Sequence, residues 1–395
     1  MKLKQIVVAL ASAGSILIAA PGVAQAGELE EMKAMLQKLQ SRIDQLESQQ
    51  AAAAAAPKAA VPSVLPGNPS FLANSSVTLY GKIDMFTEYD TRGSQGTRLA
   101  LESGGMNGSR WGVKGGADIT KDLRGIYQLE GGVYVNKGSS AQGGLLFGRQ
   151  AYAGVESKFG TFTAGRQYSP FYNTVLSFDP FEQGYGSPTN SGQVTAGTTR
   201  YDSSLVYQSP VLNGFKASAM AALGGQTGNS RHDATALSVS YSAGPLGLGA
   251  AVQRDDHVGS SNTSKHMRFL GASYQLSSTK LMAGIGRVNT DPDTGSSTHR
   301  NEWMVGSKTA VTPTGQLLLI YGRGKTDQLS DKSSAVTAGW IEALSQQVNV
   351  YGVISNHTND PASALVPMGT NSSGSYSINK GDSALGMALG FQYSF

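Results

Sequence analysis

Charged and aromatic side chains gather in one stretch of the sequence, residues 165–204. Acidic, aromatic and glycine residues fill its middle, with Asp179, Glu182 and Tyr185 among them, and arginines stand near both ends. The stretch separates two strand-like segments by far more residues than compact domains usually use, which indicates a functional loop. We predict that the loop folds into the lumen of a barrel, where its charges would act on passing solutes without being consumed.

Enzymatic, metal and nucleic-acid chemistry find little support. The histidines are scattered in or beside expected loops without the HExxH spacing of a metal site, namely His232, His257, His266, His299 and His357. The acidic tripeptide at 291–293 does not continue as a calcium-binding loop, because Thr294 and Arg300 occupy its glycine and glutamate positions. Loop tyrosines could stack on bases, but no basic stripe accompanies them. We expect no enzyme activity, no metal, no cofactor and no nucleic-acid partner.

The composition favours a membrane barrel. Only 39% of the 395 residues are hydrophobic, the mean hydropathy is -0.20, and glycine occurs 50 times. Beyond the leading segment no window offers the roughly 20 consecutive apolar residues of a transmembrane helix. Strands with one lipid-facing side need an apolar residue only at every second position. Cysteine is absent, which excludes disulfides and thiolate metal sites.

Three segments precede the expected barrel. Residues 1–26 combine a basic start, an apolar run and a small-x-small cleavage pattern, which predicts a signal peptide rather than a membrane anchor. Residues 27–50 carry apolar side chains at alternating spacings of three and four, which predicts a coiled coil; a lone amphipathic helix is the alternative. Residues 51–75 are rich in alanine and proline and form a predicted linker.

From residue 76 the dominant period is two. In the first segment Val77 and Leu79 alternate with polar residues, and the terminal segment 385–395 alternates apolar and small or polar residues up to Phe395. Lipid cannot satisfy an open sheet edge, so such strands must close into a barrel. The alternative is a soluble β-sandwich.

Connections alternate between two lengths. Tight turns are expected at 120–122, 212–214, 244–245 and 313–315, whereas long loops are expected at 224–233, 255–265, 289–301 and 357–382. This asymmetry is typical of outer-membrane barrels, whose periplasmic turns are short. At about 20 residues for each strand with its connection, residues 76–395 supply about 16 antiparallel strands. We place strand boundaries at Tyr168 and Arg200, on either side of the long stretch.

Four motifs, at 76–84, 108–115, 146–154 and 159–168, resemble those of Gram-negative general porins, most closely the β-proteobacterial type. The resemblance covers residues 76–395. It implies an outer-membrane homotrimer of all-β, 16-stranded antiparallel barrels, each with its third extracellular loop folded inward as a constriction. Phe395 looks like the family's signal to the barrel-assembly machinery. Outer-membrane lipid and lipopolysaccharide are the further partners that the resemblance implies.

The N-terminal segments depart from the usual family pattern and look like the periplasmic extension found on some porins. A role in contacting peptidoglycan is the corresponding expectation.

The resemblance maps a basic pore wall onto Lys82, Arg110 and Arg149, with Arg200 just after the loop. Alternation independently supports Lys82, Arg200 and Arg110, which shares its face with Lys114. Arg149 shares its face with apolar residues, so its assignment rests on the resemblance.

Two further assignments leave alternatives open. Arg166 fits either the pore rim or a contact with a neighbouring subunit. Asp179 and Glu182 could act on solutes directly or hold the loop down by bonding backbone N–H groups and wall arginines. The family often has Pro-Glu-Phe-Gly-Gly where residues 180–184 read Pro-Phe-Glu-Gln-Gly, so the direction of Glu182 is open.

Three functions fit these observations. The first is passive diffusion of small hydrophilic solutes, with a mild anion preference because basic candidates outnumber acidic ones. The second is a channel that prefers organic anions such as carboxylates, in which loop tyrosines and wall arginines form a weak site. The third is a tether between outer membrane and cell wall through the coiled coil.

Overall fold

The computed structural model describes most of the chain from residue 75 onward, together with six residues between 37 and 45; the described ranges are 75–223, 234–256, 263–327, 329–370 and 377–395. The chain divides into two units, Met1–Asn68 and Pro69–Phe395. The six described residues of the first unit are helical and exposed. The predicted signal peptide, the apolar seam of the coiled coil, the linker up to residue 74 and the loop 224–233 lie outside the described residues. Within the described ranges, no helix has the length and apolar content needed to cross a membrane.

The second unit is a single antiparallel sheet with short helices inside one long connection. The described strands are β1 Ser76–Thr91, β2 Thr97–Ser103, β3 Arg110–Thr120, β4 Leu123–Tyr134, β5 Ser139–Ser140, β6 Gln150–Ser157, β7 Gly160–Tyr168, β8 Arg200–Gln208, β9 Phe215–Ala222, β10 Ala234–Ala243, β11 Leu246–Asp255, β12 Ser264–Leu276, β13 Thr279–Asp291, β14 Thr298–Ala310, β15 Gly315–Thr326, β16 Ser333–Ala343, β17 Val348–Asn359 and β18 Ala384–Ser394. The described helices are α3 Pro170–Leu176, α4 Pro188–Ser191 and the 3-10 turns η2 Gly93–Gln95 and η3 Gln142–Gly144.

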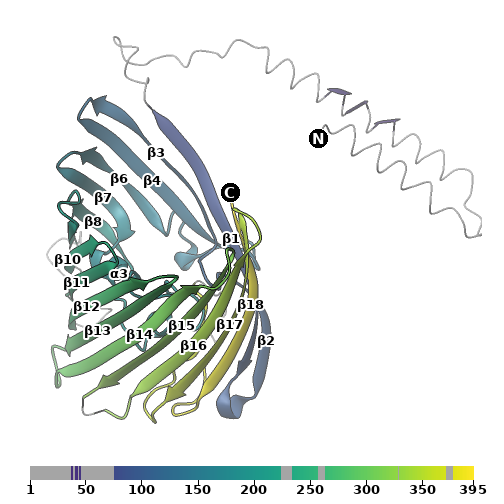
Figure 1. The fold of residues 1–395 in the computed structure, drawn as a ribbon, viewed down its shortest axis with the longest axis vertical. Coiled ribbons are helices and arrows are strands. Elements are labelled where there is room, and N and C mark those ends of the chain that lie inside the picture. Colours follow the sequence, from purple (N-terminus) through teal and green to yellow (C-terminus); the bar gives the residue numbers. More distant parts are fainter. Residues whose placement is uncertain are drawn as a thin grey trace, which may run out of the picture. The chain divides into compact units, whose positions relative to one another are not determined.

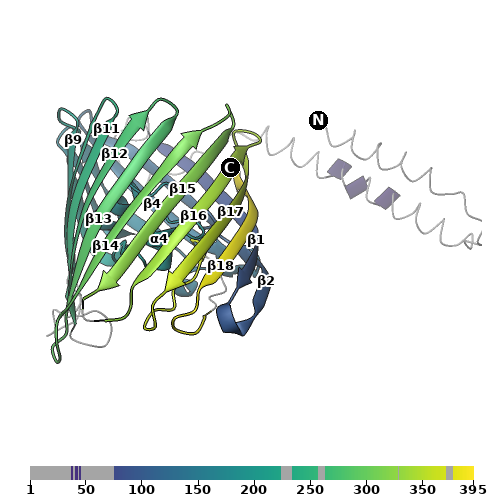
Figure 2. The ribbon, with the colours of Figure 1, turned by 60° about the horizontal axis from the view of Figure 1, so that its bottom comes forward.

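The sheet closes on itself because β1 pairs with strands on both of its edges. One edge pairs with β18 from Lys82 to Thr91. The other pairs first with β3 and then, farther along, with β2, so that β2 and β3 together occupy one position in the wall. β5 is only a two-residue pairing beside β4 and does not count as a wall strand. With β2 and β3 counted as one, the 18 described strands therefore build a wall of 16, as predicted. Figures 1 and 2 show the ring and the tilt of its strands.

Alternation along the strands separates an apolar outer face from a more polar lumen. On β1, Val77 and Leu79 are 72% and 66% exposed. On β18, Leu389 and Phe391 point outward while Ala388 and Gln392 are buried toward the inside. Outward apolar residues of this kind suit contact with acyl chains, and every ladder hydrogen bond is made within the closed sheet. The expected period of two is confirmed in both strands.

The strand boundaries differ from expectation mainly at the long loops. The boundaries at Tyr168 and Arg200 are confirmed. The loop expected at 289–301 is shorter, because β13 continues to Asp291 and β14 already begins at Thr298. These added residues pair with each other, as in Thr290 opposite Thr298. The pairing of β13 with β14 therefore extends beyond the residues that alternate between apolar and polar side chains.

The connection between β7 and β8 lies inside the ring (Figure 1). Its buried aromatic side chains pack on the inner face of the wall. Phe178 rests against Phe269 of β12, with ring centroids 6.1 Å apart. Beneath its ring lie Gly249 and Gly271, which are register partners on β11 and β12. A Cβ atom added to Gly271 would lie 2.2 Å from the Phe178 ring. Glycine is therefore needed there for the loop to approach the wall backbone.

We expect Gly271→Val to destabilise the folded barrel by about 1–3 kcal/mol, because the added side chain overpacks the seat of Phe178. The free energy of unfolding in denaturant measures the effect. Ala272→Val is the matched control, since Ala272 is exposed on the outer face of the same strand. Equal loss of stability in the two variants would contradict this account of the seat.

Candidate pore constriction

The loop begins with a short helix whose start is fixed by its sequence. Ser169 precedes Pro170, and its side chain accepts a hydrogen bond from the backbone N–H of Tyr172 at 3.0 Å. A serine cap followed by proline is a favoured helix start, because the capping oxygen satisfies an orphan N–H and proline needs no donor there. The helix α3 then runs along the inner side of β9–β12.

Asp179 organises the turn that follows α3. Its carboxylate accepts hydrogen bonds from the backbone N–H groups of Phe181 and Gln183 and from the hydroxyls of Ser187 and Thr189, at distances of 2.5–2.9 Å. The residue is only 1% exposed. Of the two roles considered for Asp179, this geometry favours the one in which the carboxylate holds the loop in shape.

Glu182 is the acidic residue of the loop that reaches open space. It and Gln183 adopt positive φ angles of 52° and 66°, which turn the chain sharply at this point. The carboxylate lies 3.1 Å from the ammonium of Lys308 on β14, and its side chain is 61% exposed. Glu182 therefore pairs with Lys308, which was not among the predicted pore residues.

The rest of the loop is bonded to the wall on the side away from α3. The N–H and hydroxyl of Thr195 both donate to Glu302 of β14 at 2.7 Å. Tyr185 is fully buried, stacks edge-on against Phe86 and donates its hydroxyl to Asp90 of β1 at 3.0 Å. Tyr185 thus anchors the loop and does not line open space.

An open space of about 300 Å³ remains between the loop and the opposite wall. The wall contributes Arg110, Glu130 and Arg149, and the loop contributes Tyr172 and Glu182, among other lining residues. The space thus has carboxylates on both sides and arginines on the wall. A solute passing here would meet fixed charges at short range, where the field is strongest.

Glu130 on β4 pairs with two of the wall arginines. Its carboxylate is 2.7 Å from Nε of Arg149 and 3.7 Å from Nε of Arg110, and it accepts a hydrogen bond from Tyr80 at 2.9 Å. Both Glu130 and Arg149 are buried, at 5% and 6% exposure. The carboxylate holds the arginines in place and offsets part of their positive field.

A stack of three side chains lies at the start of the loop. The Arg200 guanidinium lies 4.4 Å from the centroid of the Tyr168 ring, which stacks on Tyr172 at 5.2 Å. The Tyr168 hydroxyl accepts hydrogen bonds from both Arg149 and Arg200, at 2.9 and 2.6 Å. Burial raises the pKa of Tyr172, so its hydroxyl stays protonated and donates to Gln183.

The remaining predicted residues lie at different distances from this space. Lys82 is close, because its ammonium bonds the side chain of Asn107, which lines it, at 3.1 Å. Lys114 lies over the Tyr80 ring and does not line the space. Arg166 pairs with the exposed Asp202 at 2.6 Å and does not line it either. A contact of Arg166 with another subunit stays a prediction.

Two charged residues were missed by sequence reasoning, Glu130 and Lys308. Alternation on β4 gives a usable signal for Glu130, because it shares its face with Gln128, and both accept hydrogen bonds on one side of the sheet. Lys308 is far from the loop in sequence and faces it only because the barrel closes. No local pattern encodes that juxtaposition.

Comparison with known sequences identifies relatives along most of the chain. The family model of Gram-negative porins matches residues 50–362. Outer membrane porin protein 32 of Delftia acidovorans is 27% identical over 349 residues, which cover 84% of this chain and 98% of that protein. An outer membrane porin protein of Bordetella pertussis is 37% identical over 160 residues, covering 36% of this chain and 42% of that protein.

Comparison with solved structures shows the same fold. An anion-selective porin from Comamonas acidovorans superposes with a TM-score of 0.74 at 24% identity, covering 82% of this chain and all of that one. The trimer form of OmpT from Vibrio cholerae superposes with a TM-score of 0.64 at 16% identity, covering 81% and 99%.

We expect Asp179→Asn to loosen the loop, because an amide cannot accept all four hydrogen bonds and brings two donors toward groups that already donate. Loss of charge-assisted bonds should cost the loop about 2 kcal/mol or more. Protease cleavage within residues 169–199 of the folded protein measures this opening.

Glu182→Gln is the matched control, because its side chain is exposed and supports no backbone group of the loop. It should leave the rate of cleavage unchanged. Cleavage of Asp179→Asn at the rate of the unmodified protein would show that Asp179 does not hold the loop.

Proposed function

The chain belongs to the Gram-negative porin family, and from this premise we propose that it passes small hydrophilic solutes through a constriction with a mild preference for anions. The protein is a β-barrel channel of the outer membrane, as its relatives are. The observation that carries the proposal is the open space between the docked loop and the arginine-bearing wall.

The charges around this space support a small positive excess. Five cations lie on or next to it, namely Lys82, Arg110, Arg149, Arg200 and Lys308. Against them stand Glu130 and Glu182 at its surface and the buried carboxylates of Asp84 and Asp179. Because the carboxylates nearly balance the cations, the field favours anions without excluding cations.

Two similarities add to the proposal. A solved porin of the same fold from Comamonas acidovorans is described as anion-selective, and OmpT of Vibrio cholerae was solved in a trimer form. We extend to this chain the same sign of selectivity and a homotrimeric assembly. We also propose that Phe395, whose backbone pairs with Gly81 at the start of the barrel, is the assembly signal.

A second function is favoured by the stack of Arg200, Tyr168 and Tyr172. The Nε donor of Arg200 is buried and has no hydrogen-bond partner among the described residues. Because that atom is closed off, a carboxylate entering the space would meet the guanidinium of Arg149, which lines it, with Arg200 held beside it through the shared Tyr168 hydroxyl. Organic anions would then bind weakly during passage, and their concentration-dependent, saturable block of the ionic current distinguishes this function from simple diffusion.

We expect the purified protein in a planar bilayer with asymmetric KCl to show a chloride-to-potassium permeability ratio of about 2–5, equivalent to about 0.4–1 kcal/mol. The reversal potential gives this ratio. The double variant Lys82→Glu/Arg110→Glu should change the preference from anions to cations, because the local charge becomes more negative by four units. The reversal potential should then change sign.

The control for charge alone is Lys121→Glu/Lys158→Glu, which changes two exposed lysines in short turns. It should keep the anion preference. Strong cation selectivity of the unmodified protein would rule out the proposed role of the wall.

The N-terminal extension carries a separate proposal, in which residues 27–50 form a coiled coil on a linker of residues 51–75, after a signal peptide of residues 1–26. Helical, exposed residues between 37 and 45 support it. We expect deletion of residues 27–74 to weaken trimer stability or envelope integrity, because three coiled helices would add contacts between subunits or reach peptidoglycan. Resistance of the trimer to heat in detergent and leakage of a periplasmic enzyme measure the two effects. No change in either would refute a role for the extension.

A further inference from the structure

Two arginines lie side by side on the outer face of the barrel, across the wall from its lumen. Arg268 of β12 and Arg287 of β13 are register partners in the sheet. Both are exposed and alternate with the buried Phe269 and Val288. They therefore point away from the lumen, as do Leu270 and Ile285 next to them, which are 56% and 59% exposed.

This arginine pair has no counter-ion in the described part of the chain. The nearby Asp256 and Asp291 are instead directed to Arg254 and His266, at 2.8 and 4.0 Å. Arg287 makes one long hydrogen bond, from Nε to Asn289 at 3.3 Å. Like charges directly opposite each other on a sheet are destabilising, so the pair is most stable with an anion bound between them.

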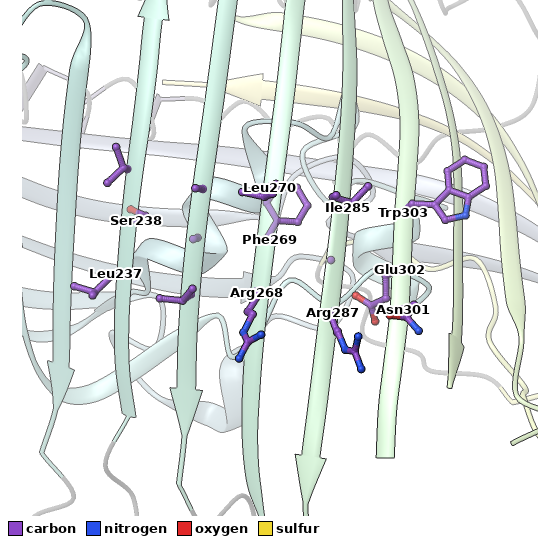
Figure 3. Close-up of a pocket in the computed structure, with 15 residues that line it drawn as sticks. Leu237, Ser238, Arg268, Phe269, Leu270, Ile285, Arg287, Asn301, Glu302 and Trp303 are labelled. Carbon is purple, nitrogen blue, oxygen red and sulfur yellow. The ribbon is translucent and has the colours of Figure 1, made fainter. Parts of the chain in front are cut away.

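An apolar hollow of about 760 Å³ adjoins the pair on the same face. Leu237, Val252, Leu270, Ile285 and Trp303 give it apolar walls, and Arg268 and Arg287 stand at one end. In Figure 3 the two guanidinium groups extend in the same direction, away from Leu270 and Ile285. The face thus offers cations at one level and a continuous apolar surface at the next.

The level of the arginines matches that of lipid head groups. Each arginine lies four residues from the long-loop end of its strand and eight residues from the short-turn end, and a transmembrane strand needs about 9–11 residues to cross the hydrocarbon core. Long loops of outer-membrane barrels face the cell exterior. Arginine on the lipid face costs about 2–4 kcal/mol at the bilayer centre but little at the interface. Trp303 lies opposite Ile285 in the sheet, and its ring lies 5.0 Å from that of Tyr321, so the two rings fit an aromatic girdle next to the arginines on the side of the short turns.

Other cations lie on the same part of the outer face. Lys325 of β15 pairs in register with Asn301, which itself lies opposite Arg287. Arg254 of β11 lies opposite His266, two residues nearer the loops than Arg268, and is already paired with Asp256. Lys325 therefore adds to the positive charge beside the arginine pair, while the surface toward the short turns is apolar.

We propose that Arg268 and Arg287 bind a phosphate group of lipopolysaccharide in the outer leaflet, with its acyl chains lying over Leu270, Ile285 and Trp303. Guanidinium groups suit this ligand, because their planar donors bind phosphate oxygens in pairs. The charge complementarity and the adjoining apolar hollow together select an amphiphile over a free anion. The ligand would be a neighbour in the membrane, bound independently of any solute in the pore.

The test is titration of the delipidated full-length protein in detergent with purified lipopolysaccharide, followed by native mass spectrometry. The variant is Arg268→Gln/Arg287→Gln. We expect its affinity to be about 25-fold lower, about fivefold for each arginine at an anionic interface. Enzymatically dephosphorylated lipopolysaccharide should bind the unmodified protein as weakly as the variant binds the intact lipid.

The matched control is Lys121→Gln/Lys158→Gln, which removes the same charge at the short turns. It should bind lipopolysaccharide like the unmodified protein. Correct folding of every variant is checked by single-channel conductance, which should be unchanged because the pair does not face the lumen.

Three results would overturn the proposal. Unchanged affinity of the arginine variant would show that the pair does not bind this lipid. Equal affinity for phosphatidylglycerol would replace lipopolysaccharide by any anionic lipid. Dissociation of the assembly in the arginine variant alone, with lipid binding retained, would assign this face to a subunit interface.

Discussion

The docking of residues 169–199 on the inner wall is the constraint on which the rest of the constriction depends. A chain segment inside a barrel must find partners for its own polar groups, since unpaired buried donors and acceptors are costly. Asp179 supplies them from within the loop, and Glu302 and Thr337 supply them from the wall. Phe178 approaches the wall closely because Gly271 leaves room for its ring. With these contacts made, the loop fills one side of the lumen and leaves the opposite side open.

The wall on the open side bears the charges that act on solutes. These charges are held in place and partly neutralised by their neighbours. Glu130 fixes Arg149 and approaches Arg110, and Tyr168 joins Arg149 to Arg200 through its hydroxyl. A rigid array keeps the field at a fixed position, whereas flexible surface charges would reorganise around each solute. The same neutralisation limits its strength, which is why the expected selectivity is mild.

Much of the fold was predictable from the sequence, because a lipid-facing barrel imposes a period of two and a closed ring. Alternation placed Lys82 and Arg110 inside, and the length of the connection identified the loop. Alternation could not assign the side chain of Arg149 to the lumen or the outer face, because Arg149 lies just before β6 begins at Gln150 and outside the regular ladder. Lys308 was missed because alternation gives the face of a strand and not its position around the ring. The burial of Asp179 and the exposure of Glu182 depend on backbone angles that the local sequence leaves open.

Glu182 lies at the surface of the open space, whereas Asp179 lies buried within the loop. The chain has no cysteine, so a single introduced cysteine is a unique reporter. The most direct measurement is the current through single channels of Glu182→Cys during exposure to an anionic thiol reagent. We expect a stepwise fall in current as the label attaches, and no fall for Ala272→Cys on the outer face. Complete labelling of Glu182→Cys with no change in current would contradict this placement of Glu182.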